Sequence, residues 1–304
     1  MARTSSEYKK LSVNEFTRAA EKYETDKAGI YELCKEDYPE IIAILQDRPF
    51  NDLLDAGCGP APLLSALCEL YPEKHFTGLD LTPAMIDKAK AKNLPNAEFY
   101  VGDCENLPFP EASFDVIVCC ESFHHYPNPQ DFFNSVHRCL RPGGMLILRD
   151  YAADGIVGFF MNRIELPMVN FFGHGDVRIS SEAELRTMCA NAGLTVERFE
   201  QLKGVKMDLI AVKPSEAVGN RQYVQETRVR RPDNIIMARF ATIRRLEYFA
   251  ETLREGERVC RSPHPPQAVP LPRKDSEELG VRSEELLRSL FEDTLHLSGA
   301  PIDY

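Results

Sequence analysis

The sequence predicts an α/β fold in which a mostly parallel, open sheet carries helices on both faces. One indication is the stretch 51–80, which reads as a strand, a glycine turn, a helix and a second strand ending in an acid. Another is the segment 113–120, whose unbroken apolar run is typical of a parallel strand buried on both faces. Helical spacing of apolar residues between such strands favours strand–helix–strand units.

The region before the first strand is expected to be helical. Ser12 and Asn14 are predicted N-caps of a first helical segment that carries Phe16 and Tyr23. Apolar residues spaced through 38–45 predict a second helical segment.

The glycine turn within 51–80 is the most informative motif. Gly57 and Gly59 let the backbone turn sharply and leave room for a ligand close to it. In an open α/β sheet, such a turn lies outside the carboxyl ends of the strands, where the strand order reverses. Asp80 closes the second strand, and its carboxylate there can accept hydrogen bonds from both hydroxyls of a ribose. The alternative is a tight turn that only packs a helix on the sheet.

The spacing of the turn separates two kinds of nucleoside cofactor. A dinucleotide fingerprint, G-x-G-x-x-G, places a pyrophosphate on the helix N-terminus. Here Pro62 stands at the third glycine position, and Asp55 lies two residues before the first glycine. An acid at that place suits a ligand with an ammonium group and a sulfonium, so a dinucleotide oxidoreductase is disfavoured.

The next helix and strand add to the same site. Thr82-Pro83 predicts an N-cap followed by proline at the first helical position. Met85 begins that helix close to the ribose acid, where it either touches an adenine face or fills the core. The strand 98–103 ends in Asp103, a second acid at the end of a successive strand.

The segment after the strand 113–120 is the most reactive-looking stretch of the chain, E-S-F-H-H-Y-P. Imidazole titrates near neutral pH, so His124 or His125 is a candidate general base. The alternative is that such a histidine only shapes the wall of the pocket.

These motifs occur in the order and spacing of a known family. D-A-G-C-G at 55–59, G-L-D-L-T at 78–82 and L-R-P-G-G at 140–144 resemble the class I S-adenosylmethionine-dependent methyltransferases. The loop S-F-H-H-Y-P at 122–127 looks like that of the ubiquinone- and menaquinone-biosynthesis type, which acts on small molecules. The resemblance covers roughly residues 11–213.

The resemblance implies a seven-stranded Rossmann-like sheet and transfer of the methyl group of S-adenosylmethionine to a small acceptor. It places Tyr23 and Tyr31 in a lid over the cofactor, with ordinary helix packing as the alternative. It assigns the adenine amino group to Asp103, a ring nitrogen to the backbone amide of Cys104, and the methionine half to the end of the strand before Glu121. The implied cofactor-binding residues are Asp55, Gly57, Cys58, Gly59, Asp80, Leu81, Met85, Asp103, Cys104, Glu121 and Ser122.

Later elements complete the predicted sheet. A helix over 129–139 and the L-R-P-G-G turn lead into the strand 145–149, and a strand pair at 194–202 and 205–212 ends the sheet, its last strand antiparallel. Ser181 and Glu184 form a predicted capping box for the intervening helix.

An insertion at 151–180 is rich in large apolar residues and is expected to cap an apolar or aromatic acceptor pocket. A small helical cap that packs on the sheet would need the same residues. His174, flanked by glycines, is a second-rank candidate base.

Composition limits the function classes. The net charge of −11 lies almost wholly in residues 1–213, which argues against nucleic-acid binding and favours a small-molecule substrate. No apolar run is long enough for a secretory signal or a membrane span. Nine scattered cysteines indicate a reduced, cytoplasmic protein, and no cluster of Cys, His, Asp and Glu has metal-ligand spacing.

The chain is therefore predicted to hold a methyltransferase domain over 1–213 and a mostly helical, proline-rich extension over 214–304. Apolar stripes at 234–255 and 284–297 predict helices that dock on the domain, on each other, or on a second copy in a homodimer. The acceptor atom (O, N, C or S) stays open. A cofactor-binding regulatory or assembly protein without turnover is the alternative function.

Overall fold

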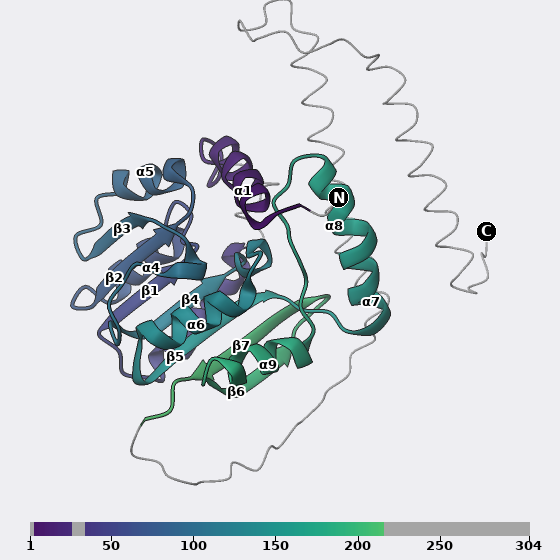
Figure 1. Cartoon of the computed structure of the whole chain (residues 1–304). Coiled ribbons are helices and arrows are strands. Elements are labelled where there is room, and N and C mark those ends of the chain that lie inside the picture. The colour runs from purple at the N-terminus through teal and green to yellow at the C-terminus, as the bar shows by residue number, and fades with distance from the viewer. Residues whose placement is uncertain (1–2, 26–33, 216–304) are drawn as a thin grey trace, which may run out of the picture. The chain divides into compact units, whose positions relative to one another are not determined.

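The computed structural model describes residues 3–25 and 34–215, which lie in one compact unit. Within these residues, seven strands form a mixed sheet of order β3-β2-β1-β4-β5-β7-β6 (Figure 1). The strands are β1 (Asp52–Ala56), β2 (His75–Asp80), β3 (Ala97–Val101), β4 (Phe114–Cys120), β5 (Leu140–Tyr151), β6 (Thr195–Gln201) and β7 (Lys206–Val212). This order confirms the predicted seven-stranded sheet.

The strand order reverses next to β1. β1 pairs in parallel with β2 on one side and with β4 on the other, so the carboxyl ends of all three lie at one edge. β7 runs antiparallel to both β5 and β6, as expected for the last strand. The crevice beside β1 at this edge is where ligands bind in open α/β sheets.

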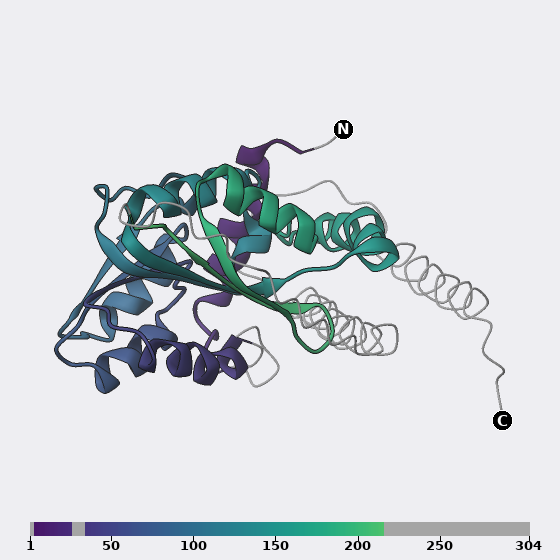
Figure 2. The ribbon, with the colours of Figure 1, turned by 90° about the horizontal axis from the view of Figure 1, so that it is seen from below.

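Helices cover both faces of the sheet (Figure 2). One apolar core joins the sheet to α6 (Pro129–Cys139) and α9 (Glu182–Asn191). The other joins it to α3 (Tyr38–Gln46), α4 (Pro62–Leu70) and α5 (Pro83–Ala91). Successive strand residues alternate between the cores, because side chains of a strand point to opposite faces: Leu53 faces the second core and Leu54 the first.

The remaining helical elements lie before the sheet or at its carboxyl edge. They are α1 (Ser5–Ala19), η1 (Lys35–Asp37), η2 (Cys104–Asn106), η3 (Phe123–His125), α7 (Gly155–Phe160), the π-helical turn η4 (Met161–Glu165) and α8 (Leu166–Phe171). The elements α7 to α8 occupy the stretch 151–180, for which a cap is predicted, and are called the cap helices below. Their exposed face carries large apolar side chains: Ile156, Phe159, Phe160, Ile164, Phe171 and Phe172.

The sequence predicted only some of the helix N-caps correctly. Thr4, and not Ser12 or Asn14, caps α1, because Thr4 and Glu7 form a reciprocal capping box. Thr82 precedes α5 but its side chain makes no cap bond. The capping box at Ser181 is confirmed.

Two strand boundaries also differ from prediction. β3 ends at Val101, so Asp103 lies two residues beyond it. The L-R-P-G-G segment belongs to β5 itself, because Leu140 already pairs with Phe114 before a register shift to Met145. Tyr31 and the predicted helices at 234–255 and 284–297 lie outside the described residues. In the described part of the chain, no helix has the length and apolar character needed to cross a membrane.

Candidate active site

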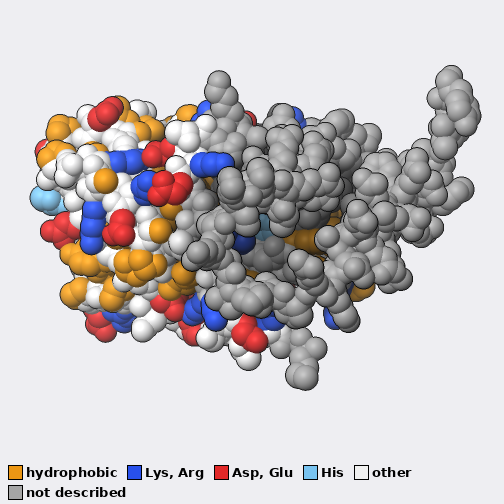
Figure 3. Space-filling view, turned by 90° about the horizontal axis from the view of Figure 1, so that it is seen from above, with side chains coloured by type: hydrophobic (Ala, Val, Ile, Leu, Met, Phe, Trp, Pro, Cys, Tyr) orange, Lys and Arg blue, Asp and Glu red, His pale blue; other side chains and the backbone are white. Residues whose placement is uncertain are grey.

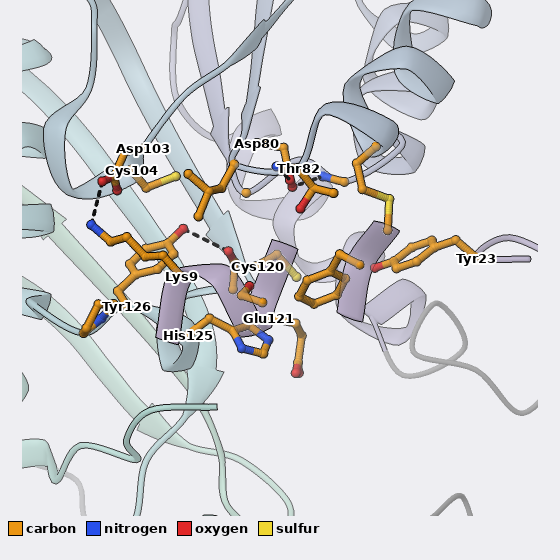
Figure 4. A pocket seen from close by; sticks show the side chains of 18 residues that line it. Lys9, Tyr23, Asp80, Thr82, Asp103, Cys104, Cys120, Glu121, His125 and Tyr126 are labelled. Carbon is orange, nitrogen blue, oxygen red and sulfur yellow. Dashed lines mark hydrogen bonds and ion pairs between the residues drawn. The ribbon is translucent and has the colours of Figure 1, made fainter. Parts of the chain in front are cut away.

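A cavity of about 650 Å³, its open mouth included, lies at the carboxyl ends of β1, β2 and β4 (Figure 4). The lining residues come from the strand ends and from α1, which lies across the mouth. They are Lys9, Ser12, Phe16, Tyr23, Gly57, Gly59, Asp80, Leu81, Thr82, Met85, Asp103, Cys104, Cys120, Glu121, Ser122, His125, Tyr126 and Pro127.

The turn requires glycine at position 57 both because of its backbone angle and because a side chain there would clash with its neighbours. Gly57 has φ +85°, and a Cβ there would lie 2.1 Å from the Oγ of Ser122. The Ser122 hydroxyl in turn hydrogen-bonds the phenol of Tyr126 at 2.9 Å. Any side chain at position 57 would push this pair into the cavity, so the turn leaves the space beside it for a ligand.

Asp80 ties the glycine turn to the end of β2. Its two oxygens accept hydrogen bonds from the backbone N–H of Gly59 (3.0 Å) and of Thr82 (2.8 Å). Burial raises the pKa of this carboxyl, and the two N–H donors act against that rise. The Thr82 side chain also hydrogen-bonds Asp80, so the carboxylate, which lines the cavity, keeps acceptor capacity for a ribose hydroxyl but not a free lone pair on every side.

Asp55 lies in a smaller neighbouring cavity together with Cys34, Tyr38 and Cys58. The two cavities share Tyr23, Gly57 and Cys120 as lining residues. Burial, and then the charge of Asp80, raises the pKa of Asp55 to about 7. A buried carboxyl of this kind gains most from a cationic ligand, as expected for the ammonium and sulfonium end of the cofactor.

Asp103 is paired with a residue of the N-terminal helix. Lys9 Nζ lies 2.6 Å from an Asp103 oxygen and also pairs with Glu105 (Figure 4). Burial lowers the pKa of Lys9, but its hydrogen bonds to Asp103 and Glu105 outweigh this and raise it. The acid assigned to an adenine amino group therefore already holds a cation from α1.

Glu121 occupies a strained position at the end of β4. Its φ of +50° is unusual for a residue with a side chain, and such strain is found at functional sites. Burial raises the pKa of Glu121, while Lys206, 3.0 Å away, opposes the rise. Lys206 also contacts Asp37 at 2.8 Å, so the cation is fixed from two sides.

The three predicted histidines lie in different places. His125 lines the cavity, and the ring of Phe16 packs edge-on against it with centroids 5.1 Å apart. His124 is buried outside the cavity, with its Nδ1 2.8 Å from an Asp150 oxygen. His174 contacts Glu15 of α1 at 2.5 Å and is not among the lining residues.

The two adjacent imidazoles also differ in charge. Burial lowers the pKa of His124, but the carboxylates of Asp150 and Asp176 outweigh it and raise the pKa to about 10. Burial and the neighbouring His124 lower the pKa of His125.

Of the predicted cofactor residues, nine lie around the larger cavity, and Asp55 and Cys58 around the smaller one. Sequence reasoning missed the lining residues Lys9 and Phe16, which lie 48 and 41 residues before the first glycine of the turn and carry no motif. It also missed Asp150, which a search for acids at strand ends would have found, because Asp150 directly follows the strand predicted at 145–149.

The fold and site together define a nucleoside-cofactor domain of the methyltransferase type. Residues 54–148 match the family described as "Methyltransferase domain". This segment is thus a class I S-adenosylmethionine-dependent methyltransferase domain, with S-adenosylmethionine as its cofactor.

Two relatives share this segment of the chain. The phthiotriol/phenolphthiotriol dimycocerosates methyltransferase of Mycobacterium leprae is 41% identical over 107 residues, 35% of this chain and 40% of that protein. The fatty-acid O-methyltransferase of Mycolicibacterium smegmatis is 37% identical over 99 residues, 32% of this chain and 36% of that protein. The chain thus aligns with well under half of either relative.

Solved structures show the same fold. The 1,6-didemethyltoxoflavin-N1-methyltransferase of Burkholderia thailandensis, with S-adenosylhomocysteine bound, matches with a TM-score of 0.53 at 19% identity, over 71% of this chain and 92% of that one. The [4+2]-cyclase SpnF matches with a TM-score of 0.52 at 16% identity, over 69% and 95%. At these identities, the likeness concerns the fold alone.

Replacement of the ribose acid should weaken cofactor binding. Asp80→Asn keeps the shape of the side chain but removes its charge and one acceptor, a loss of about 1–3 kcal/mol for a buried group. Calorimetry with S-adenosylhomocysteine should show affinity reduced about tenfold or more. Asp87→Asn, on the exposed side of the helix α5 that follows β2, is the matched control. Equal affinity of a folded Asp80→Asn protein would remove this residue from the site.

Binding of the sulfonium cofactor should depend on pH through Asp55. With a pKa of about 7, this carboxyl becomes protonated as the pH falls from 8 to 6, and its attraction for a cation is lost. Affinity for S-adenosylmethionine should fall by up to about tenfold per unit below the pKa. In Asp55→Asn, this part of the pH dependence should vanish and the affinity at pH 8 should be low.

The stability of the ligand-free protein provides a control for the titration of Asp55. The folded-state pKa of Asp55 lies above its unfolded value, so the ligand-free protein gains stability as the pH falls from 7 towards 4. Asp55→Asn should therefore raise the melting temperature of the ligand-free protein at pH 8. Identical binding profiles for wild type and variant would exclude Asp55 as the titrating group.

Proposed function

We propose that this protein transfers the methyl group of S-adenosylmethionine to an oxygen of an apolar, lipid-like small molecule. The observation that carries the proposal is the position of α1, which joins the cofactor side of the cavity to the apolar cap. Lys9 of α1 contacts Asp103, while Ser12 lies against Gly175 so closely that a Cβ on that glycine would be 2.6 Å from the Ser12 Cα. Acids proposed to bind the nucleoside and residues of α1 thus line the cavity, and α1 also contacts the segment that follows the cap helices.

The names of the two relatives support this choice of acceptor. One is a phthiotriol/phenolphthiotriol dimycocerosates methyltransferase and the other a fatty-acid O-methyltransferase. A small aromatic acceptor, suggested by the likeness of S-F-H-H-Y-P to quinone-biosynthesis methyltransferases, is the narrower variant of the proposal.

When bound, S-adenosylmethionine supplies a methyl group already activated by its sulfonium. The chain's own contribution is then to align the reactants and to exclude water. Asp80 and the glycine turn hold the ribose, and the charges of Asp55 and Glu121 favour the cationic end. Phe16 and Tyr23 shield the cavity from the side of α1. Transfer of that methyl group to an acceptor oxygen would leave S-adenosylhomocysteine, and the acceptor proton would pass to water or to a basic group of the site.

The charge pattern of the surface agrees with a small-molecule acceptor. On the face shown in Figure 3, acidic and basic side chains are interspersed with apolar ones, and the described residues there form no broad basic area. Long nucleic acids need such an area.

The proposal is tested by methyl transfer to acceptors of graded length. The full chain is incubated with radiolabelled S-adenosylmethionine and saturated fatty acids or primary alcohols, and methylated products are measured by extraction and mass spectrometry. We expect kcat/KM to rise about fourfold for each added methylene while the chain is still inside the protein, since burial of a CH₂ contributes about 0.8 kcal/mol. Asp80→Asn is the control for turnover.

A second candidate function is the binding of S-adenosylmethionine without methyl transfer, because a protein named as a [4+2]-cyclase has the same fold. A protein that binds S-adenosylmethionine without turnover would bind the cofactor in calorimetry yet label no fatty acid, alcohol or aromatic acceptor, nor any component of a cell extract. That combination would contradict methyl transfer.

The exposed apolar residues of the cap should affect long acceptors selectively. Phe159 and Phe171 are 64% and 76% exposed, so a change to serine removes apolar surface without disturbing the core. The double variant should raise KM for long-chain acceptors several-fold and leave short ones unchanged. Leu70→Ser, at the end of α4 and 53% exposed, is the matched control. A uniform effect on all lengths would show that the cap does not contact the acceptor chain.

A further inference from the structure

A group of two histidines and one aspartate lies beside the cavity. His124 and His125 come from η3, and Asp176 comes from the segment that follows the cap helix α8. One nitrogen of each ring and one Asp176 oxygen lie within 4.8 Å of one another. The side chains are 7%, 10% and 12% exposed, so the three groups are nearly removed from solvent.

The separations match those of ligands around one ion. Asp176 Oδ1 lies 3.3 Å from His124 Nε2 and 3.6 Å from His125 Nδ1. Around a tetrahedral zinc ion with bonds of about 2.0–2.1 Å, neighbouring ligand atoms lie about 3.3–3.4 Å apart. Two of the three separations are therefore close to those of zinc ligands, and the two ring nitrogens lie within 4.8 Å of each other.

The Nδ1 side of the His124 ring is hydrogen-bonded in the way that is common for histidines in metal sites. Asp150 contacts His124 Nδ1 at 2.8 Å, and that carboxylate also accepts the backbone N–H of Phe123 (2.8 Å) and Tyr151 (2.7 Å). A carboxylate so occupied makes Nδ1 the protonated nitrogen and leaves Nε2 to face Asp176. A carboxylate behind a histidine is a common outer partner of a metal-binding ring.

His125 provides a second, independent observation. Its Nδ1 is buried and has no hydrogen-bond partner, although it is aimed at the Asp176 oxygen. The ring also makes a hydrogen bond to the backbone of Gly175. With that bond made by Nε2, the lone pair of Nδ1 faces a carboxylate oxygen, which is repulsive unless a cation or a proton lies between them.

The ligands are held in place by backbone contacts. The N–H groups of Val177 and Arg178 donate to the carbonyl of His124 at 2.9 and 3.3 Å, which brings Asp176 beside η3. Asn170 Nδ2 donates to the carbonyl of Asp176 at 2.5 Å. Prior fixation of this kind lowers the cost of organising a site when an ion binds.

We propose that His124 Nε2, His125 Nδ1 and the Asp176 carboxylate bind one divalent transition-metal ion, with zinc as the best fit. Two imidazoles and one carboxylate are ligands that zinc accepts, and a fourth ligand would be water. Two carboxylates, Asp150 and Asp176, also give the site the negative charge that a dication neutralises. The ion would join the cap segment to the cavity wall next to His125. This inference does not depend on methyl transfer or on the acceptor.

Metal uptake by the full chain tests the proposal. The protein is treated with a chelator, dialysed against zinc or cobalt(II), and analysed by elemental mass spectrometry and by the visible spectrum of the cobalt form. We expect one equivalent of metal, tetrahedral ligand-field bands and no thiolate-to-cobalt charge-transfer band. The last feature excludes the buried cysteines as ligands.

Variants locate the ion. Asp176→Asn keeps the shape of the side chain and His125→Gln keeps a polar group, so both are expected to fold. Each should lower zinc affinity about 100-fold or more, because one of three protein ligands is lost. His174→Gln removes a neighbouring histidine outside the group and should keep wild-type affinity.

Two results would overturn the proposal. One is wild-type protein that takes up less than a tenth of an equivalent of either metal, since a proton on His124 would then be the only cation in the group. The other is metal uptake that Asp176→Asn and His125→Gln leave unchanged, since the ion would then bind elsewhere. The thermal stability of wild type with and without added zinc gives a second readout, which should rise only if the ion binds the folded chain.

Discussion

The site depends on one carboxylate, that of Asp80, which links two separate motifs. The parallel register brings Ala56 of β1 opposite Leu79 of β2, so the turn after one strand lies beside the end of the next. Asp80 then accepts a hydrogen bond from Gly59 in that turn and another from Thr82 at the start of α5. A buried charge is costly without such donors, and the N-terminus of α5 stabilises it further. Loss of this group would release the turn and the helix start together.

The acids of the two neighbouring cavities indicate the sign of the charge on their ligand. Burial raises the pKa values of Asp55, Asp80 and Glu121, which means that the folded ligand-free chain pays for keeping these charges. Lys206 offsets part of this cost at Glu121 only. A cationic ligand recovers the rest, so a sulfonium cofactor is stabilised by the same groups that destabilise the ligand-free state. Activity and stability are therefore opposed at these positions.

The sequence predicted those parts of the site that depend on local pattern. Glycines at 57 and 59 and acids at 80 and 103 follow strands whose periodicity is clear, and parallel strands end at one edge by necessity. Thr4 was not predicted as the N-cap of α1 because Ser12 and Asn14 also carry side chains that can cap a helix. Only the residue at which α1 begins distinguishes the three. The presence of a helix or strand was thus easier to predict than the residues at which it begins and ends.

Tertiary neighbours account for what could not be predicted. Asp176 approaches His124 and His125 only because backbone bonds join the cap segment to η3, across about 50 residues of chain. Spacing along the sequence therefore gave no sign of a metal site. Lys9 and Phe16 reach the cavity because α1 packs across its mouth, and nothing in their own segment distinguishes them from solvent-facing or core residues.

The helix α1 connects the two halves of the site. On one side, Lys9 pairs with Asp103 and Glu105. On the other, Phe16 packs on His125 while Glu15 accepts the backbone N–H of Gly175 at 2.9 Å. These contacts are mainly polar and partly exposed, so each is individually weak. One helix, α1, thus contacts both the acids Asp103 and Glu105 and the residues His125 and Gly175, which lie beside Asp176.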